Sequence, residues 1–295
     1  MLDIGCGLGS VLMTNAWQFP DAAACVGIEA QKDRYDMALR SVEYNIGGAS
    51  NEGLGEGVSG RARVKVFNAD LRELCMGATD ECVVNGQIGY DLVTGTPPYF
   101  PMATAAVPGC GESSGCLFEL RGGVEDYCAA AALYLRRPPK DADVHGGCSE
   151  RPSVFTVVNT ALASARVYSG CEAAGLSVVK RFDVIPRTGK PPLFNVFVIV
   201  LDEWLKIDGL SEVPVFPKLK RNEFGPLDIS VCPARYRVEG SVRGEEVVCL
   251  TVRDEKGNHT DDYCMLLSHL GKPSSRDKES YVLPGQDATI IGEIS

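Results

Sequence analysis

Glycine stands at alternate positions near the start of the chain, in the run Asp3-Ile4-Gly5-Cys6-Gly7-Leu8-Gly9. Glycines at this spacing, directly after a short apolar strand and before a helix, allow a tight turn and let a ligand approach the backbone closely. A dinucleotide fingerprint would place its glycines as G-x-G-x-x-G instead. The run predicts a ligand-binding turn that includes Asp3, Gly5, Cys6, Gly7 and Gly9. A glycine-rich turn without a ligand is the alternative.

Two acids follow apolar runs farther along the chain. Glu29 ends the second run, where a carboxylate can accept hydrogen bonds from both hydroxyls of a ribose. Asp70 closes Asn68-Ala69-Asp70, where its side chain can accept from an adenine amine while Ala69 leaves room for the ring. Each acid also has a plainer interpretation. Glu29 could be an exposed carboxylate at a strand end, and Asp70 could cap a helix over 71–75.

A proline-stiffened loop carries the third pattern, Thr96-Pro97-Pro98-Tyr99-Phe100. It follows an apolar strand at the carboxyl edge of the expected sheet, where open α/β sheets bind their ligands. Paired prolines restrict the backbone, and the aromatic ring of Tyr99 can stack on a planar substrate. A stiff proline turn with no chemical role is the alternative.

Repeated strand and helix units position these three patterns. Short apolar runs rich in β-branched residues alternate with amphipathic segments, which predicts an α/β fold with a mostly parallel, Rossmann-like sheet. The expected helices span Ser10–Trp17, Lys32–Asn45, Val124–Leu135 and Thr160–Ala174. The seven expected strands lie near Leu2–Ile4, Cys25–Glu29, Arg63–Phe67, Asp91–Thr94, Val154–Asn159, Leu176–Ile185 and Leu193–Leu201.

The last two expected strands are joined by residues 186–192, a connection too short for a crossover helix, so they must pair antiparallel. Residues 1–201 are expected to form this domain, and residues 202–295 an acidic C-terminal extension with short strands and one helix. The first strand has only about three residues before the glycines, against a usual five or six. The chain is therefore expected to lack upstream residues.

The combined patterns resemble a known family. The glycine run, Gly27-Ile28-Glu29-Ala30-Gln31, residues 38–45 and the strand that leads into Thr96-Pro97-Pro98-Tyr99 are similar to the amino-methyltransferases with an Asn/Asp-Pro-Pro-Tyr motif. Among these, the similarity is greatest to the bacterial enzymes that methylate the adenine amine beside the anticodon of a valine tRNA. The resemblance covers about residues 1–201. It implies the Rossmann-like fold and S-adenosyl-L-methionine as cofactor.

The resemblance also implies roles for individual residues. Asp3 would hold the methionine amino group and Glu29 the ribose, while Ala30, Ala69, Asp70 and Thr96 would complete the cofactor site. Pro97 would present its carbonyl to the acceptor amine, Pro98 would stiffen the loop, and Tyr99 with Phe100 would contact the substrate. Thr96 departs from the family, because its hydroxyl offers one oxygen and a shorter reach than a carboxamide or carboxylate.

The target atom therefore stays open. Transfer of a methyl group to a nitrogen, with an adenine amine in tRNA or rRNA as the leading acceptor, is the first hypothesis. A protein side-chain amide or a small molecule is the second, and a partner subunit that binds cofactor without catalysis is the third. A dehydrogenase is disfavoured, because the glycine spacing is wrong and no Tyr-x-x-x-Lys or paired histidine accompanies it.

Basic residues near the expected substrate edge bear on an RNA acceptor. Arg121 could contact a phosphate or carboxylate, or pair internally with Glu119 or Glu125. The loop with Arg187 and Lys190, together with Lys180 and Arg181, is either a small basic rim for RNA or a solvated loop.

Bulk composition limits partners and location. The net charge of −10 argues against a surface that binds nucleic acid everywhere. The 12 cysteines form no CxxC pair, so no metal site is expected, and reduced thiols favour the cytoplasm or nucleus. No apolar stretch approaches the roughly 18 residues of a membrane span, so no membrane partner is expected. An organellar location stays open because the N-terminus looks incomplete, and the sequence does not indicate an oligomeric state.

Overall fold

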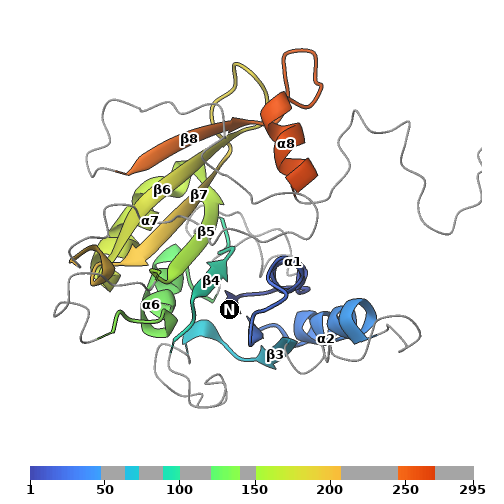
Figure 1. The fold of residues 1–295 in the computed structure, drawn as a ribbon, viewed down its shortest axis with the longest axis vertical. Coiled ribbons are helices and arrows are strands. Elements are labelled where there is room, and N and C mark those ends of the chain that lie inside the picture. Colours follow the sequence, from blue (N-terminus) through green and yellow to red (C-terminus); the bar gives the residue numbers. More distant parts are fainter. Residues whose placement is uncertain (48–63, 73–88, 100–120, 140–150, 207–244, 270–295) are drawn as a thin grey trace, which may run out of the picture.

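Eight strands form one sheet in a computed structural model that describes residues 1–47, 64–72, 89–99, 121–139, 151–206 and 245–269 (Figure 1). The strand order is β3-β2-β1-β4-β5-β7-β6-β8. The strands are β1 (Leu2–Ile4), β2 (Cys25–Glu29), β3 (Val64–Asn68), β4 (Leu92–Gly95), β5 (Val154–Thr160), β6 (Leu176–Ile185), β7 (Phe194–Leu201) and β8 (Glu246–Thr251). The expected Rossmann-like α/β fold is confirmed.

The described helices are α1 (Ser10–Gln18), α2 (Lys32–Val42), α6 (Val124–Tyr134), α7 (Ser164–Ala174) and α8 (Asp261–His269). Short helices of other types lie at η1 (Glu43–Gly47), η5 (Ala161–Ala163) and η6 (Trp204–Lys206). The helix expected from Thr160 is therefore a 3-10 turn followed by an α-helix. It ends at Gly175, whose φ of 70° is the left-handed conformation that commonly ends helices. No described helix is long and apolar enough to cross a bilayer.

The order of the strands reverses between β1 and β4. From β1 the chain runs outward to β2 and β3, then returns to place β4 on the other side of β1. The pairing of β1 with β4 is parallel and in register, with Ile4 opposite Gly95. Since parallel neighbours end at the same edge, the glycine turn after Ile4 and the proline loop after Gly95 must start side by side.

The final strands differ in part from the expectation. β7 pairs antiparallel with both β5 and β6, as the short connection predicted. All seven strands expected within residues 1–201 are present, and β8, from the extension where short strands were expected, joins the same sheet as an eighth strand, parallel to β6 at its edge. Lys180 is paired with Glu246 at 3.1 Å, and Arg181 with Asp183 at 2.8 Å. Lys180 thus joins β6 to β8, whereas Arg181 is paired within its own strand and with Glu245, beside β8, at 3.3 Å, so neither is a free cation of a basic rim. The division of the chain at residue 201 stays a prediction.

Successive side chains of the central strands point to opposite faces of the sheet and so contribute to two hydrophobic clusters. Val26 and Ile28 pack with the α6 and α7 side, while Cys25 lies in the cluster that contains residues of α1 and α2. Helices thus cover both faces of the parallel part of the sheet, and β2 is buried along its full length (Figure 1). A strand buried on both faces reads as a continuous apolar run, which is why the sequence identified it.

Gly27 fits tightly behind the glycine turn. A Cβ at this position would lie 2.7 Å from Leu12 Cδ2 and 2.9 Å from Cys6 Sγ. Cys6 in turn ties the turn to β2, because its amide donates to the Ile28 carbonyl at 2.9 Å. The absence of a side chain at Gly27 therefore lets α1 and the glycine turn pack closely against β2.

Gly27→Ala is expected to lower the free energy of unfolding by about 1–3 kcal/mol, because the added methyl overpacks this contact. Leu162→Ala is the control, since Leu162 is 100% exposed. Urea unfolding at one pH measures both. Equal stability of Gly27→Ala and the native chain would show that the turn does not rest on β2 in this way.

Candidate functional site

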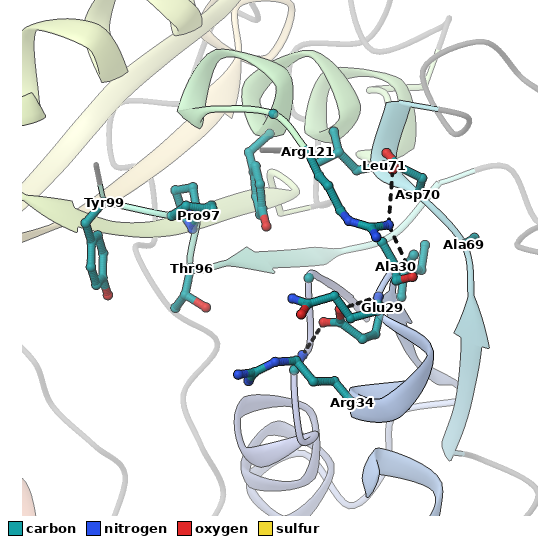
Figure 2. Close-up of a pocket in the computed structure, with 17 residues that line it drawn as sticks. Glu29, Ala30, Arg34, Ala69, Asp70, Leu71, Thr96, Pro97, Tyr99 and Arg121 are labelled. Atoms are coloured by element: carbon teal, nitrogen blue, oxygen red, sulfur yellow. Dashed lines mark hydrogen bonds and ion pairs between the residues drawn. The ribbon is translucent and has the colours of Figure 1, made fainter. Parts of the chain in front are cut away.

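A cleft of about 360 Å³ opens where β1, β2, β3 and β4 end. Its volume is within the range of pockets that bind small molecules and cofactors. Figure 2 shows its walls, with the ends of β2 and β3 on one side and the proline loop on the other. The lining residues are Gly5, Gly7, Ile28, Glu29, Ala30, Gln31, Arg34, Ala69, Asp70, Leu71, Thr96, Pro97, Pro98, Tyr99, Arg121, Gly122 and Tyr127.

The glycine turn forms the floor of the cleft. Gly5 and Gly7 have φ values of 65° and 57°, in the region that L residues with a side chain avoid. A Cβ on Gly5 would lie 2.3 Å from the hydroxyl of Tyr127, whereas a Cβ on Gly7 would meet nothing within 4 Å. Contact with Tyr127 thus excludes a side chain at Gly5, whereas Gly7 faces open space in the cleft.

Glu29 links the turn to the end of β2. One carboxylate oxygen accepts from the Gly7 amide at 2.9 Å, and the other accepts from the Gln31 amide at 2.8 Å. The side chain is almost fully buried. Each carboxylate oxygen can accept more than one hydrogen bond, so the group keeps acceptor capacity on the side that faces the cleft. The interpretation of Glu29 as an exposed strand-end acid is wrong.

Asp70 lies at the opposite end of the cleft from the proline loop, after β3 (Figure 2). It accepts from the Arg72 amide at 3.0 Å, as a residue that caps a helix start does, and from the Arg72 guanidinium at 2.7 and 2.9 Å. Hydrogen bonding to Arg72 holds the pKa of Asp70 below its ordinary value. Both expected features of Asp70, the capping geometry and a position in the cleft, are present.

Arg121 reaches across from the start of the α6 region to the same end of the cleft. Its guanidinium donates to the Ala30 carbonyl at 3.4 Å and lies 3.8 Å from an Asp70 oxygen. Of the two internal partners considered for Arg121, Glu125 is paired with Arg166 at 2.6 Å instead, and Glu119 lies outside the described residues. Arg121 thus faces the residues expected to surround an adenine, and not the acceptor loop.

Asp3 lies behind the turn, outside the residues that line the cleft. One carboxylate oxygen accepts from the Thr94 hydroxyl at 2.7 Å, while Oδ2 is buried without a hydrogen-bond partner among the described residues. Burial raises the pKa of Asp3 to about 7, although the Thr94 hydrogen bond opposes the shift. A buried carboxylate with an unused oxygen is a site where a positive charge would be stabilised.

The proline loop forms the other wall. Thr96 is exposed and Pro97 is buried. The ring of Tyr99 packs against Phe194 at the start of β7, with a centroid separation of 5.4 Å and an interplanar angle of 50°. Burial raises the pKa of the Tyr99 phenol above its ordinary value, so the ring stays neutral at physiological pH. Phe100 lies outside the described residues.

The structure thus brings most of the predicted site together. Gly5, Gly7, Glu29, Ala30, Ala69, Asp70, Thr96, Pro97, Pro98, Tyr99 and Arg121 all line the cleft. Asp3, Cys6 and Gly9 do not line it. Cys6 packs against Gly27, where burial raises its pKa, and Gly9 caps the start of α1.

Sequence reasoning missed several wall residues, of which Arg34 and Tyr127 are the largest. Arg34 lies on α2 and Tyr127 on α6, and both fit the sequence pattern of an ordinary helix, so nothing marked them as site residues. The one available signal for Arg34 is its place in the first helical turn after Glu29. Among the described residues, no group of three or more His, Cys, Asp or Glu side chains could hold a metal ion.

Comparison with known proteins finds similarity at the level of structure alone. No protein-family model and no curated protein sequence matches the chain. A predicted O-methyltransferase from Agrobacterium tumefaciens is 12% identical, with a TM-score of 0.46 over 92% of this chain and 88% of that chain. TrmN from Thermus thermophilus is 14% identical, with a TM-score of 0.39 over 68% and 43%. The ribosomal protein L11 methylase from Lactobacillus delbrueckii subsp. bulgaricus is 11% identical, with a TM-score of 0.36 over 68% of each chain.

Asp3→Asn is expected to change how stability depends on pH. The native carboxyl holds its proton up to about pH 7, whereas in the unfolded chain it loses the proton near pH 4, so rising pH in this window favours unfolding. The total effect is about 4 kcal/mol at most. An asparagine has no such proton, so the stability of the variant relative to the native chain should rise between pH 4.5 and 7.5. Urea unfolding of both proteins across this range measures the difference, and a constant difference would contradict the assigned pKa.

Proposed function

We propose that this chain is an S-adenosyl-L-methionine-dependent methyltransferase that acts on a planar nitrogen, with an adenine amine in RNA as the acceptor. The observation that carries the proposal is the arrangement of two segments on one cleft. The glycine turn and the proline loop follow the paired residues Ile4 and Gly95, at the point where the strand order reverses. Open α/β sheets bind nucleotides at this point.

The residues of the cleft fit the proposed cofactor. Gly7 leaves space for close approach, and the buried carboxylate of Glu29 offers acceptors to two ribose hydroxyls. Ala69 and Leu71 supply an apolar wall for an adenine ring beside Asp70. The Asp3 carboxylate, whose Oδ2 has no partner among the described residues, would stabilise the methionine ammonium by its charge from behind the turn. When bound, the sulfonium supplies an activated methyl group.

The proline loop would orient the acceptor. The lone pair of a planar amine is delocalised into its ring, so acceptors aimed at the amine hydrogens favour the geometry from which the nitrogen can attack. The Pro97 carbonyl and the Thr96 hydroxyl are the candidates for this role, and Thr96 is the weaker of the two because it has one oxygen. Tyr99, held against Phe194, would stack on the base.

The choice of RNA draws support from charge at the same edge of the sheet. Thr160 at the end of β5 pairs with Phe194, so the loop between β6 and β7 lies at the edge that carries the cleft. Arg187 and Lys190 on this loop are exposed. In a chain of net charge −10, exposed cations beside the acceptor wall favour an anionic acceptor. Transfer of labelled methyl to fractionated tRNA, rRNA and protein, followed by nucleoside analysis, tests the acceptor class.

Gly7→Ala is expected to weaken S-adenosylmethionine binding at least tenfold, because its Cβ would occupy open space in the cleft wall. Gly175→Ala is a matched control, since Gly175 also has a positive φ and open space around its Cβ but lies at the end of α7. Both variants should lose about 1–2 kcal/mol of stability from backbone strain. Calorimetric titration measures the affinities. Equal affinities of the two variants would remove the turn from the cofactor site.

Tyr99→Ala is expected to lower methyl transfer at least tenfold and to leave the affinity for S-adenosylmethionine within about twofold, because the lost stacking acts on the acceptor. Tyr99→Phe keeps the ring and should retain most of the rate. Initial rates at saturating cofactor, with tRNA as the varied substrate, give the comparison. Full activity of Tyr99→Ala would sink the assigned role of this loop.

A further inference from the structure

The guanidinium groups of Arg121 and Arg34 both reach the cleft, but they differ in their contacts with the rest of the chain. Arg121 contacts the Ala30 carbonyl and faces Asp70, so it is held by its own chain at the expected adenine end. Arg34 lies in the first turn of α2 and lines the same cleft in a half-buried position. In Figure 2 its side chain extends away from Asp70, on the side of the cleft where Thr96 and Tyr99 lie.

The acids of the cleft, and Asp36 two positions along α2, are used elsewhere, while Asp33 precedes Arg34 directly and adjacent helix positions do not face each other. The Glu29 carboxylate accepts from the amides of Gly7 and Gln31, and Asp36 is paired with Lys32. Asp70 is paired with Arg72. Within the described part of the chain, no acidic side chain forms an ion pair with Arg34. The guanidinium is therefore available to a ligand.

The position of Arg34 also concentrates positive potential. The first turn of a helix carries a partial positive charge from its free amides, so a cation there opposes the helix dipole and does not stabilise α2. For an anion that enters the cleft, the attraction of the helix dipole and the attraction of the guanidinium add to each other. The planar guanidinium suits a phosphate through two parallel hydrogen bonds.

We propose that Arg34 binds a phosphate group of the methyl acceptor and thereby positions the acceptor base against Tyr99. This inference rests on the proposed function. The group recognised is a nucleotide phosphate, which either the backbone of an RNA or a free mononucleotide could supply.

The test uses the full chain with saturating S-adenosylhomocysteine, and unfractionated tRNA as the probe in equilibrium binding at several salt concentrations. Arg34→Gln is expected to weaken tRNA binding about tenfold and to reduce the slope of log affinity against log salt by about one, as loss of one phosphate contact does. Arg34→Lys keeps the charge and should recover most of the affinity. Arg40→Gln is the matched control, because Arg40 is exposed on the same helix and does not line the cleft.

Competition with 5′-AMP and with adenosine separates the two sources of phosphate. If RNA supplies the phosphate, 5′-AMP should displace tRNA no better than adenosine does at equal concentration. An advantage of 5′-AMP that Arg34→Gln abolishes would support the same contact with a free nucleotide as its source.

Two results would overturn the proposal. Unchanged tRNA affinity and salt slope in Arg34→Gln would show that no phosphate contact exists. A loss of S-adenosylmethionine affinity in Arg34→Gln, beyond that in Arg40→Gln, would place Arg34 in the cofactor site instead. Calorimetry of the native chain with S-adenosylmethionine is run alongside, and failure of the native chain to bind would count against the proposed function and not against the phosphate contact.

Discussion

The parallel pairing of β1 with β4 is the constraint on which the cleft depends. Ile4 lies opposite Gly95, so the two segments that leave these strands begin as neighbours although more than ninety positions separate them in the chain. A shift of this register by one residue would turn the side chains of β1 to the opposite faces of the sheet and would move the glycine turn relative to the proline loop. The tight fit of Gly5 against Tyr127 and of Gly27 against Cys6 fixes the turn from both sides.

Negative and positive side chains lie at different places around the cleft. Asp3 and Glu29 place two buried carboxyl groups beneath and beside the glycine turn, and each is held by hydrogen bonds from the protein. Arg121 and Arg34 place two cations at the rim. A ligand with a positive end near the turn and an acceptor with a negative group near the rim would both meet complementary potential. The same chain can therefore be acidic overall and still favour a phosphate at one place.

The sequence predicted the elements of the fold well, because their signals are local. Continuous apolar runs marked the buried strands, and the short link over residues 186–192 required an antiparallel pair. It predicted short strands and a helix in the C-terminal extension, where β8 and α8 lie, but not that β8 joins the main sheet, since its partner β6 lies far away in the chain. Side-chain partners were predicted least well. Arg121 faces Asp70, and Arg34 reaches the cleft, through proximity that only the folded sheet creates.

A crystal structure of the chain with S-adenosylhomocysteine would show directly whether the glycine turn and the proline loop hold this ligand between them. We expect the ribose hydroxyls to contact Glu29, the adenine to lie between Ala69 and Arg121, and the sulfur to face the loop from Thr96 to Tyr99. A ligand bound elsewhere, or one whose sulfur points away from this loop, would contradict this arrangement.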